Sequence, residues 1–175
     1  MFSLLFIFAS FILLIFLLIG SSLPNCIDLN EEIDIKTEPE EAFLQFADLK
    51  SFIAWSPLFL NIPISNIIFE GERLTVGDTV RFRKKINSFE KSISISHMEI
   101  NEKIFFEFDF GFRNKGKMQI NINQMEKGET TIYWNFSLYL GNNPIERLYG
   151  FFMKNNLKKS MTIGLKKLKE KLETS

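Results

Sequence analysis

The sequence comprises 175 residues, enough for one domain of ordinary size. Lys plus Arg equal Asp plus Glu at 21 each, so the chain has no net charge that would attract nucleic acid or an acidic surface. The single cysteine, Cys26, excludes an internal disulfide, and the single histidine, His97, excludes a multi-histidine metal site. We therefore expect no metal, no cofactor and no nucleic-acid partner.

The N-terminal segment is almost purely apolar. No charged side chain occurs in residues 1–27, and residues 2–19 consist mainly of Phe, Leu and Ile. About 20 apolar residues cross the hydrocarbon core of a bilayer, so we interpret residues 1–22 as a transmembrane anchor. Two alternatives stay open: a signal peptide cleaved near Gly20, which lacks the usual preceding positive residue, and a lipoprotein modified at Cys26.

The charges that follow this segment indicate its orientation. Asp28, Glu31, Glu32 and Asp34 all precede the first cation, Lys36. Cations collect on the cytoplasmic side of membrane anchors, and none collects here. We expect a single-pass membrane protein whose domain, residues 26–175, lies outside the cytoplasm, with a secreted protein as the alternative.

The start of this domain predicts one strand and two short helices. Residues 27–35 alternate between apolar and polar side chains, as in a half-buried strand. Thr37, Pro39 and the acids after it are helix-start signals, followed by apolar residues between Ala42 and Leu49. A second short helix is expected from Leu49 to Trp55.

Six further strands are expected in the middle of the chain, at residues 66–73, 79–85, 91–100, 103–112, 117–123 and 130–140. The turns between them are short, which predicts antiparallel pairing. Alternation predicts that one face of these strands is buried. Its members are Ile93, Ile95, His97, Ile104, Phe106, Phe108, Phe110, Phe112, Met118, Ile120, Ile122, Ile132, Trp134, Phe136, Leu138 and Leu140.

A long amphipathic helix is expected from Asn143 to Glu173. Pro144 suits a first helical turn, and apolar residues then recur at three- and four-residue steps. They are Leu148, Phe152, Met153, Leu157, Met161, Gly164, Leu165, Leu168 and Leu172. A helix of this length needs an equally long apolar partner, so the sequence predicts an α+β fold in which a curved sheet holds the helix.

Several short motifs occur in one order over about 140 residues. They are residues 38–43 with 48–50, Trp55-Ser56-Pro57, Val76-Gly77, residues 101–104, 131–134, 148–153 and 164–168. In these motifs the chain resembles the START-like (SRPBCC) superfamily, in particular its polyketide cyclase/dehydrase and lipid transport branch, some members of which begin with a hydrophobic anchor. It departs at His97, where related sequences often carry a carboxylate.

This resemblance implies a helix-grip fold, in which a seven-stranded antiparallel sheet curves around the C-terminal helix and leaves a cavity for a hydrophobic small molecule. Ligand cavities are mainly apolar, and methionine adapts to varied guests. The candidate ligand-binding residues are Trp55, Phe82, His97, Phe106, Phe108, Trp134, Phe136, Met153, Leu157 and Met161.

Three functions are consistent with the sequence. We favour non-catalytic binding, and possible transport, of a lipid or similar hydrophobic molecule, because no acid–base or metal constellation is evident. The first alternative is a polyketide cyclase or dehydratase with His97 as its acid or base. The second is a fully packed interaction module without a ligand.

Overall fold

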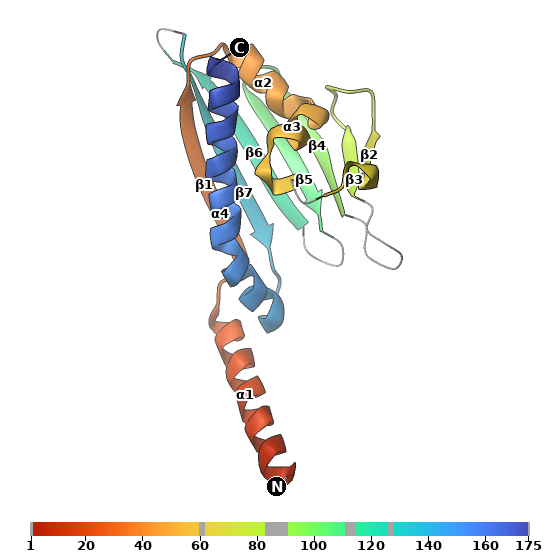
Figure 1. Ribbon diagram of the computed structural model, residues 1–175, viewed down its shortest axis with the longest axis vertical. Helices are drawn as coiled ribbons and strands as arrows, with labels where there is room; N and C mark the ends of the chain where they lie inside the picture. The colour runs from red at the N-terminus through yellow and green to blue at the C-terminus, as the bar shows by residue number, and fades with distance from the viewer. Residues whose placement is uncertain (1, 60–61, 83–90, 111–114, 126–127, 175) are drawn as a thin grey trace.

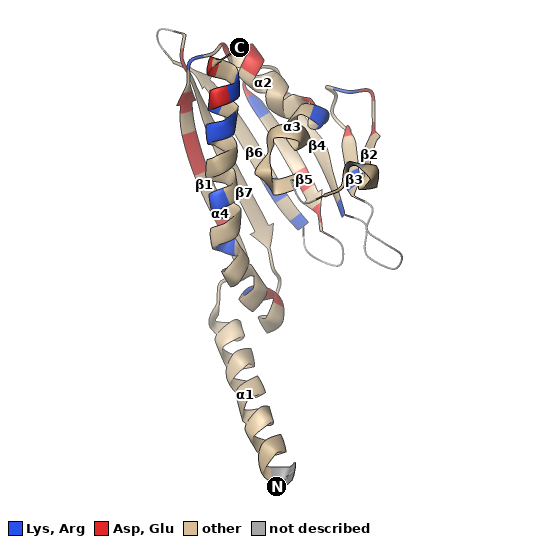
Figure 2. Ribbon diagram, in the orientation of Figure 1, with Lys and Arg blue, Asp and Glu red and all other residues tan. Residues whose placement is uncertain are grey.

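The computed structural model describes residues 2–59, 62–82, 91–110, 115–125 and 128–174. Helix α1 (Phe2–Ser22) projects from one end of a compact α+β domain and meets the domain only near its own C-terminal end (Figure 1). Residues Leu4–Ser22 have a mean hydropathy of 2.9 and are long and apolar enough to cross a membrane. Their large side chains are exposed, and no charged side chain interrupts the helix (Figure 2).

Seven antiparallel strands form one sheet, as predicted. They are β1 (Cys26–Ile35), β2 (Ile67–Glu70), β3 (Thr79–Phe82), β4 (Lys91–Glu99), β5 (Lys103–Asp109), β6 (Lys115–Gln124) and β7 (Thr130–Tyr139). The sheet order is β1-β7-β6-β5-β4-β3-β2, so β2 to β7 form a meander and β1 adds to its final strand. Register is continuous between β1 and β7, from Cys26 opposite Tyr139 to Ile35 opposite Thr130.

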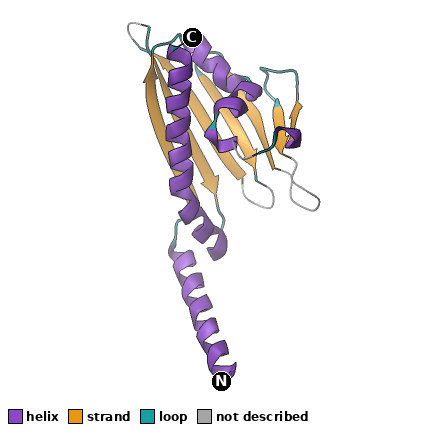
Figure 3. Cartoon of the chain, in the orientation of Figure 1, coloured by secondary structure: helices purple, strands orange, loops and turns teal. Residues whose placement is uncertain are grey.

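The helices cover one face of this sheet (Figure 3). Helix α4 (Pro144–Glu173) lies along β1 and β7, while α2 (Pro39–Ala47) and α3 (Leu49–Trp55) lie across the central strands. Two short 3₁₀ turns, η1 (Pro57–Phe59) and η2 (Ile64–Asn66), lead from α3 to β2. This arrangement is the predicted helix-grip fold, with the core between the helices and the inner face of the sheet.

The N-terminus of helix α4 is capped by a side chain, and only part of its predicted apolar stripe is buried. Its N-cap residue is Asn143, whose side-chain oxygen accepts a hydrogen bond from the Ile145 amide at 3.0 Å, as is usual for this position. The predicted stripe is fully buried only from Met161 onward, at Met161, Gly164, Leu165 and Leu168. The prediction is wrong for Phe152, which is exposed because it lies on the face of α4 opposite Gly150, and Gly150 is the residue that packs on Leu140 and on Ile27 of β1.

A β-bulge on β4 places His97 on the opposite face of the sheet from the one predicted. Ile95 lies opposite Phe106, but His97 lies opposite Phe105, so Ser96 is an extra residue without a partner on β5. The bulge shifts the alternation by one residue. His97 therefore points to the outer face with its side chain 61% exposed, and the prediction that it faces the interior is wrong.

Strand β2 is shorter than predicted because the chain turns sharply after Glu70. Arg73 and Leu74 both have positive φ angles, 73° and 62°, which no strand residue adopts. The carboxylate of Asp78 holds this turn by accepting hydrogen bonds from the amides of Arg73 and Thr75, at 3.1 and 2.9 Å. The predicted ends of two other strands, residues 83–85 and 111–112, lie outside the described part of the chain.

Candidate functional site

The interior between α4 and the sheet contains an aromatic cluster in its central part. Phe46 of α2 and Phe52 and Trp55 of α3 pack on Trp134 of β7, with ring centroids 5.8 to 6.0 Å from that indole. Phe52 also stacks on Phe106 of β5, at 5.6 Å. All five side chains are buried. This part of the interior is solid protein, since rings at these separations are in direct contact.

Helix α4 approaches this cluster closely at Gly164. A Cβ atom added there would lie 3.1 Å from Cδ of Pro57 and 3.4 Å from the rings of Trp55 and Trp134. The distance to Pro57 is shorter than an ordinary contact, so glycine lets the helix rest on the two indoles without displacing Pro57. Met161, one turn earlier, is also fully buried. Gly164 thus brings α4 into contact with the aromatic cluster.

Two buried polar atoms in this region have no hydrogen-bond partner among the described residues. They are Oγ of Ser56 and Nε1 of Trp134. By contrast, Nε1 of Trp55 donates to the carbonyl oxygen of Gln45 at 3.1 Å. An unpaired buried donor costs about 1–3 kcal/mol, so each of these atoms would gain from a polar group of a bound molecule or a water.

The interior is less tightly closed toward the end of the sheet where α1 joins. Phe108, Phe136 and Leu138 retain 6–7% exposure, whereas Ile104 and Trp134, deeper along the same strands, are at 0%. Register places Leu138 and Phe108 on either side of Gly116, which contributes no side chain to this row. We call this end of the sheet, where these buried side chains keep slightly more exposure than those deeper along the strands, the α1 end.

The helix opposite this end contributes two half-buried side chains. Leu157, one turn before Met161, packs against the buried core, and Met153, two turns before Met161, is half-buried on the same side of α4. The same part of α4 is tied to β1 through Glu31, which accepts a hydrogen bond from Oγ1 of Thr162 at 2.8 Å. Glu31 also lies 3.6 Å from Nζ of Lys158. These polar contacts close the edge of the interior between α4 and β1.

The structure brings nine of the ten predicted site residues to the inner side of the sheet. They are Trp55, Phe82, Phe106, Phe108, Trp134, Phe136, Met153, Leu157 and Met161. The exception is His97, which packs on Phe105 on the outer face at a centroid separation of 5.6 Å. That the nine bind a ligand stays a prediction. The predicted site residues did not include Phe46, Phe52 and Phe59, which lie in three separate elements, α2, α3 and η1, so no single helical spacing relates them.

A separate groove of about 520 Å³ lies on the outer face of the sheet, away from α4. It is lined mainly by outward-pointing polar side chains of β1, β4, β5, β6 and β7, among them Asn30, His97, Glu107, Gln119 and Asn135. An acid or base for interior chemistry would have to face inward, and His97 faces this groove. The predicted catalytic role of His97 in an interior pocket therefore has no support in the geometry.

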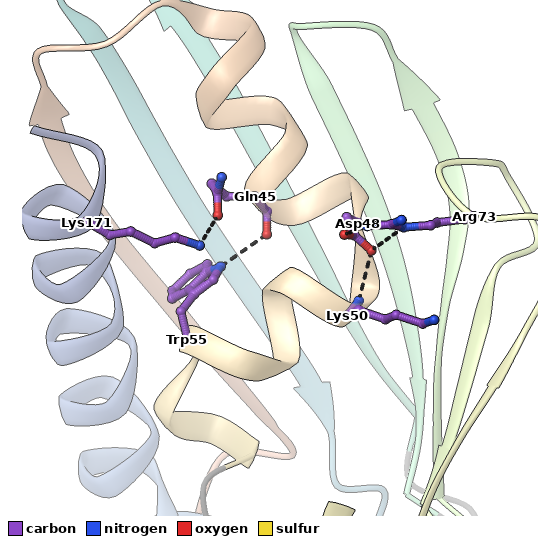
Figure 4. A network of polar contacts seen from close by, with 6 residues as sticks. All are labelled: Gln45, Asp48, Lys50, Trp55, Arg73 and Lys171. Atoms are coloured by element: carbon purple, nitrogen blue, oxygen red, sulfur yellow. Dashed lines mark hydrogen bonds and ion pairs between the residues drawn. The ribbon is translucent and has the colours of Figure 1, made fainter. Parts of the chain in front are cut away.

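An ion pair fixes the helices over the sheet (Figure 4). The carboxylate of Asp48, between α2 and α3, accepts hydrogen bonds from Arg73 and from the Lys50 amide. The Arg73 guanidinium lowers the pKa of the Asp48 carboxyl, against the opposing effect of burial. At the other side of the pair of helices, Nζ of Lys171 donates to the side-chain oxygen of Gln45 at 2.7 Å. Both contacts have structural roles.

Within the described part of the chain, no group of three or more His, Cys, Asp or Glu side chains is placed to hold a metal ion. The lone thiol of Cys26 is exposed and donates to the carboxylate of Asp28 at 2.9 Å. This hydrogen bond is the main reason that the pKa of the Cys26 thiol is raised, so the thiol is less reactive than an ordinary one.

Comparison with solved structures supports the fold. An uncharacterized protein from Rhizobium leguminosarum has a TM-score of 0.59 and 13% identity, over 86% of this chain and 96% of that chain. The Aha1 dimer from Colwellia psychrerythraea has a TM-score of 0.57 and 17% identity, over 84% and 96%. DynU16, a protein of the dynemicin biosynthetic locus, has a TM-score of 0.55 and 14% identity, over 84% of this chain and 47% of that chain.

At these identities the likeness establishes the fold alone. No protein-family model matches the chain, and no curated protein matches its sequence. The chain thus has the helix-grip architecture, which can enclose a ligand between helix and sheet.

Proposed function

We propose that this protein is anchored in a membrane by α1 and binds a hydrophobic small molecule of lipid type without covalent chemistry. The site is the α1 end of the interior, between Met153 and Leu157 of α4 and Phe108, Phe136 and Leu138 of the sheet. The observation that carries the proposal is the small difference in burial along the inner face: Phe108, Phe136 and Leu138 are buried but keep 6–7% exposure, against 0% for Ile104 and Trp134 deeper along the same strands. An apolar guest is favoured where apolar side chains converge and the protein covers them least completely.

The proposed site lies at the end of the domain nearest to α1 (Figure 1). A lipid that enters from a bilayer would therefore have a short path to it. The chemistry of the lining agrees with such a guest, because the five side chains named above are all apolar and include two phenylalanines and a methionine. The resemblance to the START-like superfamily, whose members bind lipids, sterols and polyketides, supports the same class of ligand.

The enzyme alternative is less well supported than binding. It depends on His97, which lies on the outer face beside Phe105 and Glu99. The alternative of a packed module without ligand draws support from the solid aromatic cluster around Trp134. Binding and complete packing make opposite predictions for the α1 end of the interior, so one experiment separates them.

The test is extraction of the full chain, purified in detergent, with organic solvent and quantification of apolar molecules by mass spectrometry. We expect about one molecule of a defined class per chain, as for other enclosed sites. Leu157→Trp places a larger side chain in the proposed site and should reduce this amount strongly. Ile163→Trp, on the exposed face of the same helix, is the matched control for bulk lipid carried over in the detergent micelle.

A second measurement is thermal stability with added lipids. A ligand at 100 times its Kd stabilises the folded state by about 2.7 kcal/mol, which is readily seen as a shift in Tm. If wild type and Leu157→Trp yield the same lipids in the same amounts, and neither is stabilised by any lipid of a broad panel, the packed module is the correct description.

A further inference from the structure

A cluster of exposed apolar side chains occupies the first three turns of α4. Ile145, Tyr149, Phe151 and Phe152 are between 56% and 69% exposed. Ile145, Tyr149 and Phe152 follow one another at four- and three-residue steps, so they form a stripe on the helix face opposite the buried Gly150. Exposed apolar groups that gather in this way mark an interaction surface.

The place of this stripe in the fold indicates what covers it. Only residues 23–25 connect the end of α1 to β1, a length of at most about 14 Å when extended. Helices α1 and α4 are also in direct contact, since a Cβ atom at Gly20 would clash with the carbonyl oxygen of Pro144. The stripe therefore begins directly beside the end of the apolar helix.

Arg147 fixes this junction. Its guanidinium donates hydrogen bonds to the carbonyl oxygens of Ser21 and Leu23, at 3.0 and 3.2 Å, and to that of Gly141 at 3.0 Å. Ser21 and Leu23 lie at the C-terminal end of α1, where unpaired carbonyl groups favour a cation. These hydrogen bonds thus fix the position of the first turns of α4 relative to the C-terminal end of α1.

The residue types agree with a position at a bilayer surface. Aromatic side chains, tyrosine above all, are enriched where the hydrocarbon core meets the headgroups. Two of the chain's three tyrosines, Tyr139 and Tyr149, are exposed at this end of the domain. Lys154, Lys158 and Lys159 follow the stripe along α4, farther from α1 (Figure 2). Lysine side chains just beyond the stripe are placed to attract the anionic phosphates of lipid headgroups.

We propose that the Ile145–Phe152 stripe is a membrane contact, in which the first three turns of α4 lie in the headgroup layer of the bilayer that α1 crosses. This inference rests on the proposed anchoring by α1 and adds an orientation to it. The stripe spans about 10 Å along the helix axis, which is within the roughly 5–10 Å to which amphipathic helices enter the boundary between headgroups and acyl chains. The α1 end of the interior then faces the lipid surface.

The test uses the full chain in vesicles of phosphatidylcholine and phosphatidylglycerol, with a tryptophan reporter at Phe152→Trp. The vesicles contain either ordinary phosphatidylcholine or the same lipid brominated near the carbonyl end of its acyl chains, which quenches nearby indoles. Wild type, with buried Trp55 and Trp134, gives the background emission. The matched control is Ile163→Trp, on the same face of α4 but about 16 Å farther along its axis.

Brominated lipid should remove most of the emission added by Phe152→Trp and leave the emission added by Ile163→Trp unchanged. Equal quenching of both variants, or of neither in chains that float with the vesicles, overturns the contact while the anchoring by α1 stands. A blue-shifted Phe152→Trp emission that bromine does not quench assigns the stripe to a second protein copy and also overturns it. Chains that do not float with the vesicles overturn the anchoring together with the contact.

Discussion

The carboxylate of Asp48 is bound by the guanidinium of Arg73 through two hydrogen bonds, from Nη2 at 2.6 Å and from Nε at 3.3 Å (Figure 4). The pair joins the start of α3 to the turn after β2, and Asp48 also accepts a hydrogen bond from the Lys50 amide at 3.1 Å. The side chain of Asp48 is 10% exposed and that of Arg73 is 63% exposed. One carboxylate thus caps a helix and holds that helix over the outermost strands of the sheet.

The first prediction concerns the pH dependence of this contact. The folded protein lowers the pKa of Asp48, below the value of about 3.9 that an aspartate has in an unfolded chain. Its contribution to stability is therefore present above about pH 4 and is lost as the pH falls through the folded-state pKa. Asp48→Asn removes the negative charge that binds Arg73 and should be less stable than wild type at pH 7. The expected loss is only about 1 kcal/mol, because Arg73 is exposed and solvent screens the ion pair.

Urea unfolding of wild type and Asp48→Asn at pH 7 and pH 3 measures this difference, which should shrink at the lower pH. Arg73→Met should lose a similar amount at pH 7, and the double variant should lose little more than either single one. Additive losses in the double variant would show that the two side chains do not stabilise the fold through each other.

The second prediction concerns the bulge on β4. His97→Ala should change the free energy of unfolding by less than about 0.5 kcal/mol, because an exposed side chain away from the core contributes little. Ile95→Ala, two residues earlier and 1% exposed, should cost about 2–5 kcal/mol. Urea unfolding of the two variants compares the faces directly. A large loss for His97→Ala would mean that the imidazole faces the core and that the bulge is misplaced.

This bulge illustrates which features a sequence predicts. Ile93 and Ile95 follow the two-residue alternation, and continuing it places His97 inside. No residue type between Ile95 and His97 signals an insertion, because Ser96 is as ordinary in a strand as in a bulge. The sheet, its antiparallel order and the buried faces of β5, β6 and β7 were predictable, since each depends on alternation within one strand and on short turns.

The interior was predictable only in part. The inward direction of Phe106, Trp134 and Phe136 follows from alternation along their own strands. Which of them are covered by protein depends on Phe46 and Phe52, which belong to helices, and their contact with the sheet is a long-range relationship. A pattern in one segment does not specify the fit between two segments. Hence the aromatic lining was predicted and the solid packing around Trp134 was not.

The third prediction concerns the contact of α4 with the aromatic cluster at Gly164. Gly164→Leu should destabilise the protein by about 1–3 kcal/mol, because the new side chain meets the rings of Pro57, Trp55 and Trp134 at distances that leave no room. Ile163→Leu, at the adjacent exposed position, should be nearly neutral. Thermal unfolding of both variants, followed by near-ultraviolet circular dichroism, reports stability and tryptophan packing together. An unchanged spectrum and Tm for Gly164→Leu would contradict this contact.

The fourth prediction concerns the junction between α1 and α4. Arg147→Met removes the hydrogen bonds to the carbonyl oxygens of Ser21, Leu23 and Gly141. The Leu140 amide, which donates to the carbonyl oxygen of Asn25 at 2.8 Å, lies at the same junction and reports its opening. Its hydrogen exchange in the full chain should become about tenfold faster, which corresponds to a loss of about 1.4 kcal/mol in local stability.

The matched control is Lys154→Met, which removes a cation from the same side of α4 two turns later. We expect it to leave the exchange of Leu140 unchanged, because Lys154 donates none of the hydrogen bonds at the junction. Neither variant should alter exchange at the buried strand residues Ile120 and Trp134, since the core does not depend on α1. If Arg147→Met and Lys154→Met accelerate the Leu140 amide equally, a general loss of positive charge explains the effect, and the hydrogen bonds of Arg147 do not hold α1 to the domain.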